Sequence, residues 1–282
     1  HKDATGGRVE VLFLEEEQPG LWLALYKAAG GARPGARFRS PSGRIRGELV
    51  DRAPEGRVRL RVASDGPFLE ALEAEGAPPL PPYIRRPRGA GAADPAQLAA
   101  DRERYQTVFA RQAGSVAAPT AGLHLSHPLL EAVKARGATL ATVTLHVGLG
   151  TFKPIASADL DGHVMHEERY DVTPETAACL NRIRETGGRW VAVGTTSARV
   201  LETATDAQGI LRAGAGRTRL FIRPPYRFKG VDALLTNFHL PRSTLLVLVS
   251  ALAGWEAIRG AYAEAVRERY RFFSYGDCML IQ

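Results

Sequence analysis

The 282-residue sequence has few cysteines, few lysines and no long uncharged apolar run. Its two cysteines, Cys179 and Cys278, lie far apart, which excludes a disulfide framework and a Cys-x-x-Cys metal cage. The uncharged run from Ser243 to Trp255 is shorter than the ~20 residues that a membrane-spanning helix needs. No secretory signal is visible. We therefore expect a protein of the reducing cytoplasm that has no membrane partner.

The composition, 45% hydrophobic and 24% charged, excludes a disordered or collagen-like chain. At about 150 residues per domain, the length predicts one large domain or two unequal ones. The sequence begins with His1 rather than methionine, and we expect that a further N-terminal portion precedes it in the natural protein.

Positive charge is concentrated near the start of the sequence. Residues 33–61 contain nine arginines and three acidic residues, a balance of 9 − 3 = +6. Because guanidinium groups pair with phosphates, this segment favours a polyanionic partner such as nucleic acid. A GC-rich codon bias would produce the same excess of arginine over lysine, and this alternative stays open.

Residues 1–63 are expected to form a small antiparallel β-barrel domain. Short alternating runs such as residues 57–62 (RVRLRV) are typical of half-buried strands, and glycines separate them. Residues 64–282 are expected to form a large α/β catalytic domain with a barrel-like arrangement. Its predicted helices cover residues 68–75, 95–112, 127–136 and 174–186, and its predicted strands cover residues 115–118, 139–147, 190–193, 220–222 and 231–235.

Small, hydroxyl and imidazole residues follow four of these apolar runs, and they include His124, His146 and His239. In α/β folds, ligands bind at the carboxyl ends of strands, so this pattern predicts a site there. Residues 194–197 (GTTS) offer backbone N–H groups to an anion, although helix capping by Thr or Ser explains them equally well. The His163-x-x-His166-Glu167 order matches neither zinc-protease arrangement, so we predict no metal.

Eight segments in order resemble the S-adenosylmethionine:tRNA ribosyltransferase-isomerase (QueA) family of queuosine biosynthesis. They are residues 79–84 (PLPPYI), 105–109 (YQTVF), 117–124 (AAPTAGLH), 145–154 (LHVGLGTFKP), 165–168 (MHEE), 192–199 (AVGTTSAR), 232–244 (DALLTNFHLPRST) and 270–277 (YRFFSYGD). The resemblance implies a large mixed α/β domain with an inserted small β-barrel. It also implies that the ribosyl part of S-adenosylmethionine is transferred to the 7-aminomethyl group of a 7-deazaguanine base in the tRNA wobble position. The ribosyl part then rearranges to an epoxy-cyclopentanediol, and adenine and methionine are released.

The implied reaction needs three proton transfers, which imidazoles and carboxylates can perform. The candidate catalytic residues are His124, His146, His166, Glu167, His239 and Asp277. The candidate S-adenosylmethionine-binding residues are Gly148, Gly150, Thr151, Phe152, Gly194, Thr195, Thr196, Ser197, Phe238 and Tyr275, whose aromatic members could hold the sulfonium by cation–π attraction. Arg57, Arg59 and Arg61 lie on one side of a predicted strand and are the candidate tRNA-binding residues.

S-adenosylmethionine is expected as a co-substrate, with no recycled cofactor, and the enzyme is expected to be a monomer. Two other classes stay open. One is a metal-dependent hydrolase that uses His163 and His166, and the other is a non-catalytic RNA-binding module built on the arginine-rich strands.

Overall fold

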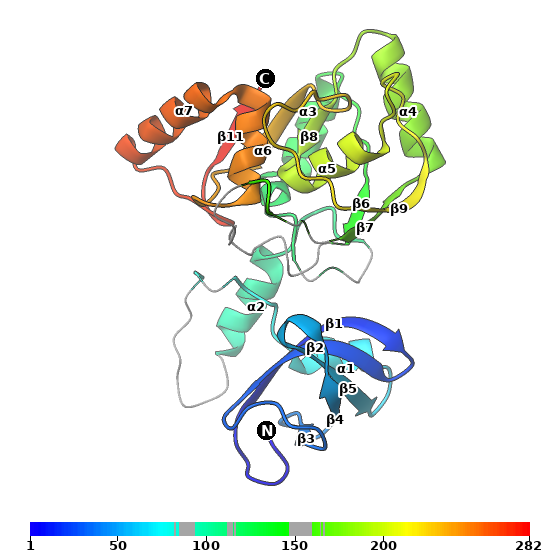
Figure 1. Cartoon of the computed structure of the whole chain (residues 1–282), viewed down its shortest axis with the longest axis vertical. Helices are drawn as coiled ribbons and strands as arrows, with labels where there is room; N and C mark the ends of the chain where they lie inside the picture. Colours follow the sequence, from blue (N-terminus) through cyan, green and yellow to red (C-terminus); the bar gives the residue numbers. More distant parts are fainter. Residues whose placement is uncertain are drawn as a thin grey trace. The chain divides into compact units, whose positions relative to one another are not determined.

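The computed structural model describes residues 1–81, 83–84, 94–111, 115, 117–146, 160–163, 165 and 167–282. The fold is mixed α/β, as predicted, and the chain splits into two compact units, His1–Glu103 and Arg104–Gln282 (Figure 1). Each unit has its own hydrophobic core.

The first unit is built on a five-stranded antiparallel sheet with the order β1-β2-β5-β4-β3. Its strands are β1 (Val9–Gln18), β2 (Leu21–Ala28), β3 (Arg37–Arg39), β4 (Ile45–Arg52) and β5 (Arg57–Ser64). Backbone hydrogen bonds join the first residues of the chain to the outer edge of β3, for example Arg39 N–H to the His1 carbonyl at 2.9 Å. The described strands do not close into a barrel, so that arrangement stays a prediction.

The core of this sheet contains Ala24, Phe38, Leu49, Val58 and Leu60. Phe38 lies directly opposite Gly47 on the paired strand, and its ring covers the glycine. A Cβ atom on Gly47 would approach the Phe38 ring to 2.2 Å, so only glycine fits there.

Two helices follow the sheet, and the second of them ends at the boundary between the two units. Helix α1 (Phe68–Glu75) has the predicted bounds and ends at Gly76, and Phe68 places its ring 4.8 Å from that of Trp22. Helix α2 (Pro95–Arg104) begins where predicted but ends eight residues before the expected position 112. After the helix, the side-chain oxygen of Thr107 accepts a hydrogen bond from the backbone N–H of Phe109 at 3.3 Å, which holds a turn in place of the predicted helical residues.

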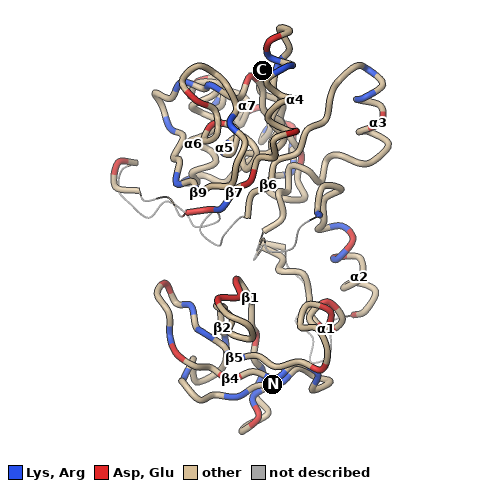
Figure 2. The backbone as a smooth tube through the Cα atoms, turned by 90° about the vertical axis from the view of Figure 1, so that its right-hand side faces the viewer, with Lys and Arg blue, Asp and Glu red and all other residues tan. Residues whose placement is uncertain are grey.

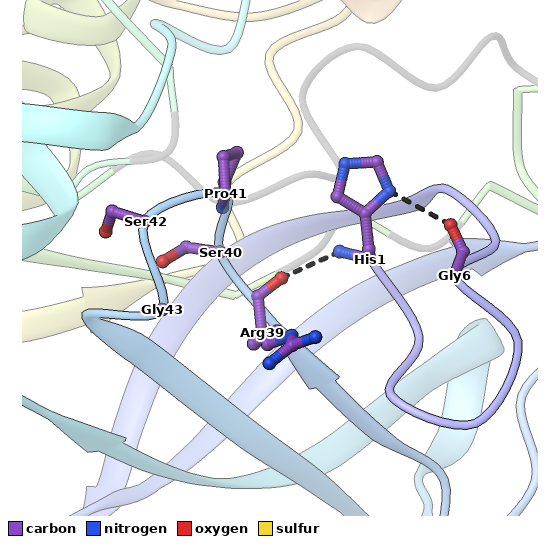
Figure 3. A pocket seen from close by; sticks show the side chains of 7 residues that line it. All are labelled: His1, Gly6, Arg39, Ser40, Pro41, Ser42 and Gly43. Carbon is purple, nitrogen blue, oxygen red and sulfur yellow. Dashed lines mark hydrogen bonds between the residues drawn. The ribbon is translucent and has the colours of Figure 1, made fainter.

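A hollow of about 310 Å³ in the first unit is formed by the turn after β3 and the start of the chain (Figure 3). It is lined by His1, Gly6, Arg39, Ser40, Pro41, Ser42 and Gly43. The candidate site residues are not among those that line it.

The second unit contains two three-stranded sheets. One has the order β11-β10-β8, in which β8 (Val191–Val193) and β10 (Ala233–Asn237) are parallel and β11 (Cys278–Ile281) is antiparallel to β10. The other is antiparallel with the order β6-β7-β9, formed by β6 (Thr144–His146), β7 (Glu168–Val172) and β9 (Gly214–Thr218). The described parts of the predicted strands 115–118 and 220–222 are irregular, because these short apolar runs pack into the unit without a ladder partner.

Helices cover both sheets, and local signals define their ends. Helix α3 (His127–Ala135) and helix α4 (Pro174–Glu185) begin where predicted. Ser126 caps α3 and Thr173 caps α4, each side chain accepting a backbone N–H three residues on. The remaining helices are η2 (Thr120–His124), α5 (Gly194–Ala204), α6 (Thr244–Ala253) and α7 (Trp255–Arg267).

Helix α5 is the central helix of the second unit. It contacts β8 and β10 of one sheet, β6 and β9 of the other, and η2. Eight of its residues are buried, including the charged residues Arg199 and Glu202. The helix is therefore the element that positions the two sheets relative to each other.

No single helix in the described part of the chain is long and apolar enough to cross a membrane. Helices α6 and α7 meet that test only as a pair, and the chain bends by 115° between them.

The Phe38–Gly47 contact gives a test of the first unit's packing. The substitution Gly47→Ala should destabilise the unit by about 1–3 kcal/mol, because the added methyl group forces the Phe38 ring out of its position. Gly260→Ala is the control, since nothing lies within 4 Å of a Cβ atom there, and it should stabilise helix α7 by about 0.5–1 kcal/mol. Urea unfolding followed by circular dichroism measures both. Equal stability of Gly47→Ala and the unsubstituted protein would contradict this account.

Candidate active site

The parallel strands β8 and β10 end at the same edge of their sheet, where Val193 is paired with Leu235. Helix α5 begins at Gly194 with no intervening loop, and Gly194 has a φ of +86° that favours glycine. A Cβ atom on Gly194 would lie 3.4 Å from the Cβ of Ala121 in η2. Three of the predicted strand-end segments, residues 117–124, 192–199 and 232–239, are thus brought together.

The first turn of α5 contains Thr195, Thr196 and Ser197, and Thr195 is buried. The alternative that Thr or Ser caps this helix is wrong, because the N-cap residue is Val193, which makes no side-chain cap bond. No side-chain cap therefore occupies the backbone N–H groups at the start of α5, and such groups can bind a ligand anion.

His124 lies beside Asn237 at the carboxyl end of β10. The Asn237 amide nitrogen is 3.0 Å from His124 Nε2 and 3.1 Å from the Phe273 carbonyl oxygen. The Asn237 amide oxygen lies 3.5 Å from the Thr120 hydroxyl. One buried amide thus connects η2, β10 and the loop that precedes β11.

Two opposing effects act on His124. Partial burial lowers the pKa of its imidazole, and the nearby carboxylate of Asp277 acts in the opposite direction. Asp277 accepts the backbone N–H of Arg271 at 2.7 Å and a guanidinium N–H of Arg271 at 3.1 Å. These bonds lower the pKa of Asp277, so it is ionised at neutral pH.

His239 has a different environment from His124. It is 9% exposed, its Nε2 is 3.0 Å from the Thr236 hydroxyl, and its backbone N–H donates to the Tyr262 hydroxyl at 2.7 Å. Burial lowers the pKa of His239 to about 4, so its imidazole is neutral at neutral pH. This is the geometry of a packed histidine.

The two candidate aromatic residues also differ. Phe238 is buried in a cluster of rings, with centroids 5.4 Å from Tyr262, 5.7 Å from Tyr270 and 5.1 Å from Phe272. Tyr275 is 37% exposed and contacts the ring of Tyr105 at 5.6 Å. Tyr275 is therefore the more accessible ring for a sulfonium.

A buried ion pair joins α5 to the second sheet. Arg199 donates from a terminal guanidinium nitrogen to Glu168 at the start of β7, and the two side chains are 5% and 1% exposed. Because Glu168 follows Glu167 in the segment 165–168 and Arg199 ends the segment 192–199, the pair connects two of the segments that carry the family resemblance.

His146 ends strand β6 opposite Arg169 of β7 and is half-buried. Glu167 forms ion pairs with Arg217 at 2.6 Å and Arg219 at 3.2 Å. The hydrogen bond from Arg217 and the two positive charges lower the pKa of Glu167. Glu167 is therefore ionised and is a weak base.

Five candidate residues lie outside the described residues: Gly148, Gly150, Thr151, Phe152 and His166. Within the described residues, no three His, Cys, Asp or Glu side chains gather in a group that could hold a metal ion. The His163 ring instead packs against Phe221 at 5.2 Å.

Sequence reasoning missed two residues of this region, Asn237 and Arg199. Both lie in segments that the resemblance contains, at the end of a strand and in the first turns of a helix. Asn237 was overlooked because it does not titrate, and Arg199 because an arginine in a helix usually faces solvent.

The arginines of β5 lie on the predicted common face, opposite the buried Val58 and Leu60. Arg59 forms ion pairs with Glu17 at 2.6 Å and Asp51 at 3.2 Å, and Arg57 approaches Glu55 to 3.7 Å. Arg61 is exposed. Basic and acidic segments alternate along the strands of this unit (Figure 2).

A family model described as "Queuosine biosynthesis protein" matches residues 1–281. The chain belongs to this family. The eight segments and their spacing are therefore those of a family member.

Two relatives with the name S-adenosylmethionine:tRNA ribosyltransferase-isomerase are similar to nearly the whole chain. The protein of Desulforamulus reducens is 48% identical over 280 residues, which cover 99% of this chain and 79% of the relative. The protein of Syntrophotalea carbinolica is 52% identical over 280 residues, which cover 98% of this chain and 78% of the relative. A crystal structure of an S-adenosylmethionine tRNA ribosyltransferase from Thermotoga maritima is 33% identical and covers 98% of this chain and 76% of that chain, with a TM-score of 0.47.

The buried imidazole of His239 predicts a loss of stability in acid. Its pKa is about 4 in the folded chain and about 6.5 when unfolded, so between these values the unfolded chain binds the extra proton. Stability should therefore fall by up to about 3 kcal/mol as the pH drops from 7 to 4.

Urea unfolding at pH 7 and pH 5 measures this effect. His239→Gln should remove most of the difference between the two pH values, whereas the exposed control His127→Gln should retain it. An unchanged difference in His239→Gln would rule out His239 as the cause.

Proposed function

We propose that this chain is an S-adenosylmethionine:tRNA ribosyltransferase-isomerase. It transfers the ribosyl part of S-adenosylmethionine to the 7-aminomethyl group of 7-aminomethyl-7-deazaguanine at the wobble position of tRNA and isomerises it, which gives epoxyqueuosine-tRNA, adenine and methionine. The observation that carries the proposal is the family match over residues 1–281, together with two relatives of that name at about half identity.

In the proposed reaction, S-adenosylmethionine is a co-substrate, and no recycled cofactor takes part. His146 and His166 are our candidates for the proton transfers, and the first turn of α5 is our candidate for binding the methionine carboxylate or the ribose. Tyr275 has the exposed ring that a sulfonium needs. We further propose that residues 64–282 carry the catalysis and that the enzyme is a cytoplasmic monomer.

Neither alternative class has support. A metal-dependent hydrolase would need a third ligand beside His163 and His166, and the described residues near His163 offer the ring of Phe221 instead. A non-catalytic RNA-binding module would not need His124, Asn237 and the first turn of α5 to meet at one sheet edge.

The proposed activity predicts specific products. The protein, incubated with S-adenosylmethionine and tRNA bearing the 7-aminomethyl base, should release adenine and methionine in equal amounts. Liquid chromatography of the small molecules measures both, and unmodified tRNA is the control that should release neither. Formation of S-adenosylhomocysteine and methylated tRNA without free adenine would refute the proposal.

We also propose that Arg57, Arg59 and Arg61 contact tRNA phosphates. The three side chains share one face of β5, which supports a common partner. The ion pairs of Arg59 with Glu17 and Asp51 neutralise part of that charge, so the exposed Arg61 should contribute most.

Salt dependence tests this role of the three arginines. Changing Arg57, Arg59 and Arg61 to Gln should weaken tRNA binding and reduce the slope of log affinity against log salt by about 0.7–0.9 for each phosphate that is no longer neutralised. Arg61→Gln alone should reduce the slope more than Arg59→Gln alone. S-adenosylmethionine affinity should stay constant in all three variants. An unchanged slope in the triple variant would place tRNA binding elsewhere.

A further inference from the structure

The contact between Asn237 and His124 bears on the position of the imidazole and on which of its nitrogens carries the proton. Asn237 is 4% exposed, and its amide nitrogen has two neighbours, His124 Nε2 at 3.0 Å and the Phe273 carbonyl oxygen at 3.1 Å. Because a carboxamide NH₂ group carries two hydrogens, it can donate one to each neighbour.

The orientation of the amide follows from the Phe273 carbonyl, which can only accept. If the amide were turned over, its oxygen would face another oxygen at 3.1 Å, with no hydrogen between them. In the present orientation the Asn237 oxygen is 3.5 Å from the Thr120 hydroxyl, which can donate to it. The amide nitrogen therefore faces His124.

The Asn237 N–H group that faces Nε2 determines which ring nitrogen of His124 carries the proton. Nε2 must accept, so the neutral ring carries its proton on Nδ1. Burial favours this neutral form, since it lowers the pKa of His124. The charged groups nearby are Asp277, which opposes that shift, and Arg271, which pairs with Asp277.

We propose that Asn237 is a positioning residue that holds His124 as the neutral Nδ1–H tautomer, so that His124 donates a hydrogen bond to the departing purine instead of acting as a base. The role rests on the proposed function. When the bond between ribose carbon and purine nitrogen breaks, the purine takes the electron pair and gains negative charge. A neutral imidazole N–H stabilises that charge without giving up its proton, as a preorganised donor does in an oxyanion hole, and the purine then takes a proton from water to become neutral adenine. The base that removes the ribose proton is then another residue.

The first test needs no substrate. In ¹⁵N-labelled protein, long-range ¹H–¹⁵N correlation of the histidine rings at neutral pH should show His124 with a protonated Nδ1 and a bare Nε2. The signal is assigned by its loss in His124→Gln. A protonated Nε2 would overturn the proposal, whatever the enzyme's activity.

The second test uses Asn237→Asp, which places a carboxylate against Nε2. The ring should then carry its proton on Nε2, and its pKa should rise. Asn181→Asp is the matched control, because the Asn181 amide also holds backbone, donating to the Leu211 carbonyl at 3.0 Å and accepting the Leu211 N–H at 2.9 Å. The control should leave the His124 spectrum unchanged. An unchanged spectrum in Asn237→Asp would overturn the proposal.

The third test measures adenine release. Asn237→Asp should lower kcat about 10²-fold at pH values above the raised pKa of His124, where Nδ1 carries no proton, with little change in the KM for S-adenosylmethionine. Asn181→Asp should change neither. His124→Asn keeps an N–H donor near the position of Nδ1 and should retain more activity than His124→Ala. Equal activity of these two variants would refute the donor role.

The three tests separate the two proposals. If the unsubstituted protein shows the Nδ1–H tautomer but releases no adenine with modified tRNA, the proposed function fails and the tautomer assignment stands. If Asn237→Asp does not fold, the spectrum of the unsubstituted protein and the ratio of His124→Asn to His124→Ala still decide.

Discussion

The ion pair between Arg199 and Glu168 constrains how the central helix of the second unit meets the antiparallel sheet. It is almost fully buried and joins the helix of one sheet to the first residue of a strand in the other. Removing one partner of such a pair costs about 3–5 kcal/mol, because the remaining charge stays buried without its counter-ion. Helix α5 contacts η2 and β10, which carry His124 and Asn237, and it also contacts β6, which carries His146. The pair therefore joins β7 to the helix that contacts the elements carrying these three residues.

The groups around α5 divide by charge in a way that suits a cationic substrate. The imidazoles of His124 and His239 are held neutral by burial, while Asp277 and Glu167 are held ionised by arginines. Neutral imidazoles do not repel a sulfonium, and the arginine-paired carboxylates stay charged as a proton moves. This arrangement adds no imidazolium charge, and such a charge would oppose the binding of a positive sulfur atom.

The sequence predicted several helix ends, which depend on residues that are close together in the chain. Ser126 and Thr173 marked two helix starts, and Gly76 marked the end of α1, because a cap acts within a few residues. Strand pairing and burial were harder to predict, because they depend on residues that are far apart in the chain. The apolar residues 220–222 resemble a strand but have no ladder partner within the described part of the chain. His124 and His239 both follow apolar runs, yet only the folded chain makes one half-exposed and the other buried. Asn237 lacked a chemical signal of its own, because its importance comes from which nitrogen of His124 it faces.

The junction between β8 and α5 has no spare residue. Val193 ends the strand and Gly194 begins the helix, with the left-handed backbone that a direct change of direction requires. Since an α-helix turns by about 100° for each residue, one inserted residue would rotate every side chain of α5 by that angle about the helix axis. Arg199 would then leave Glu168, and the hydroxyl groups of the first turn would leave the sheet edge. The direction in which each side chain of α5 points is thus set by the number of residues between β8 and the helix. A single extra glycine at the junction would change that direction although no side chain had been altered.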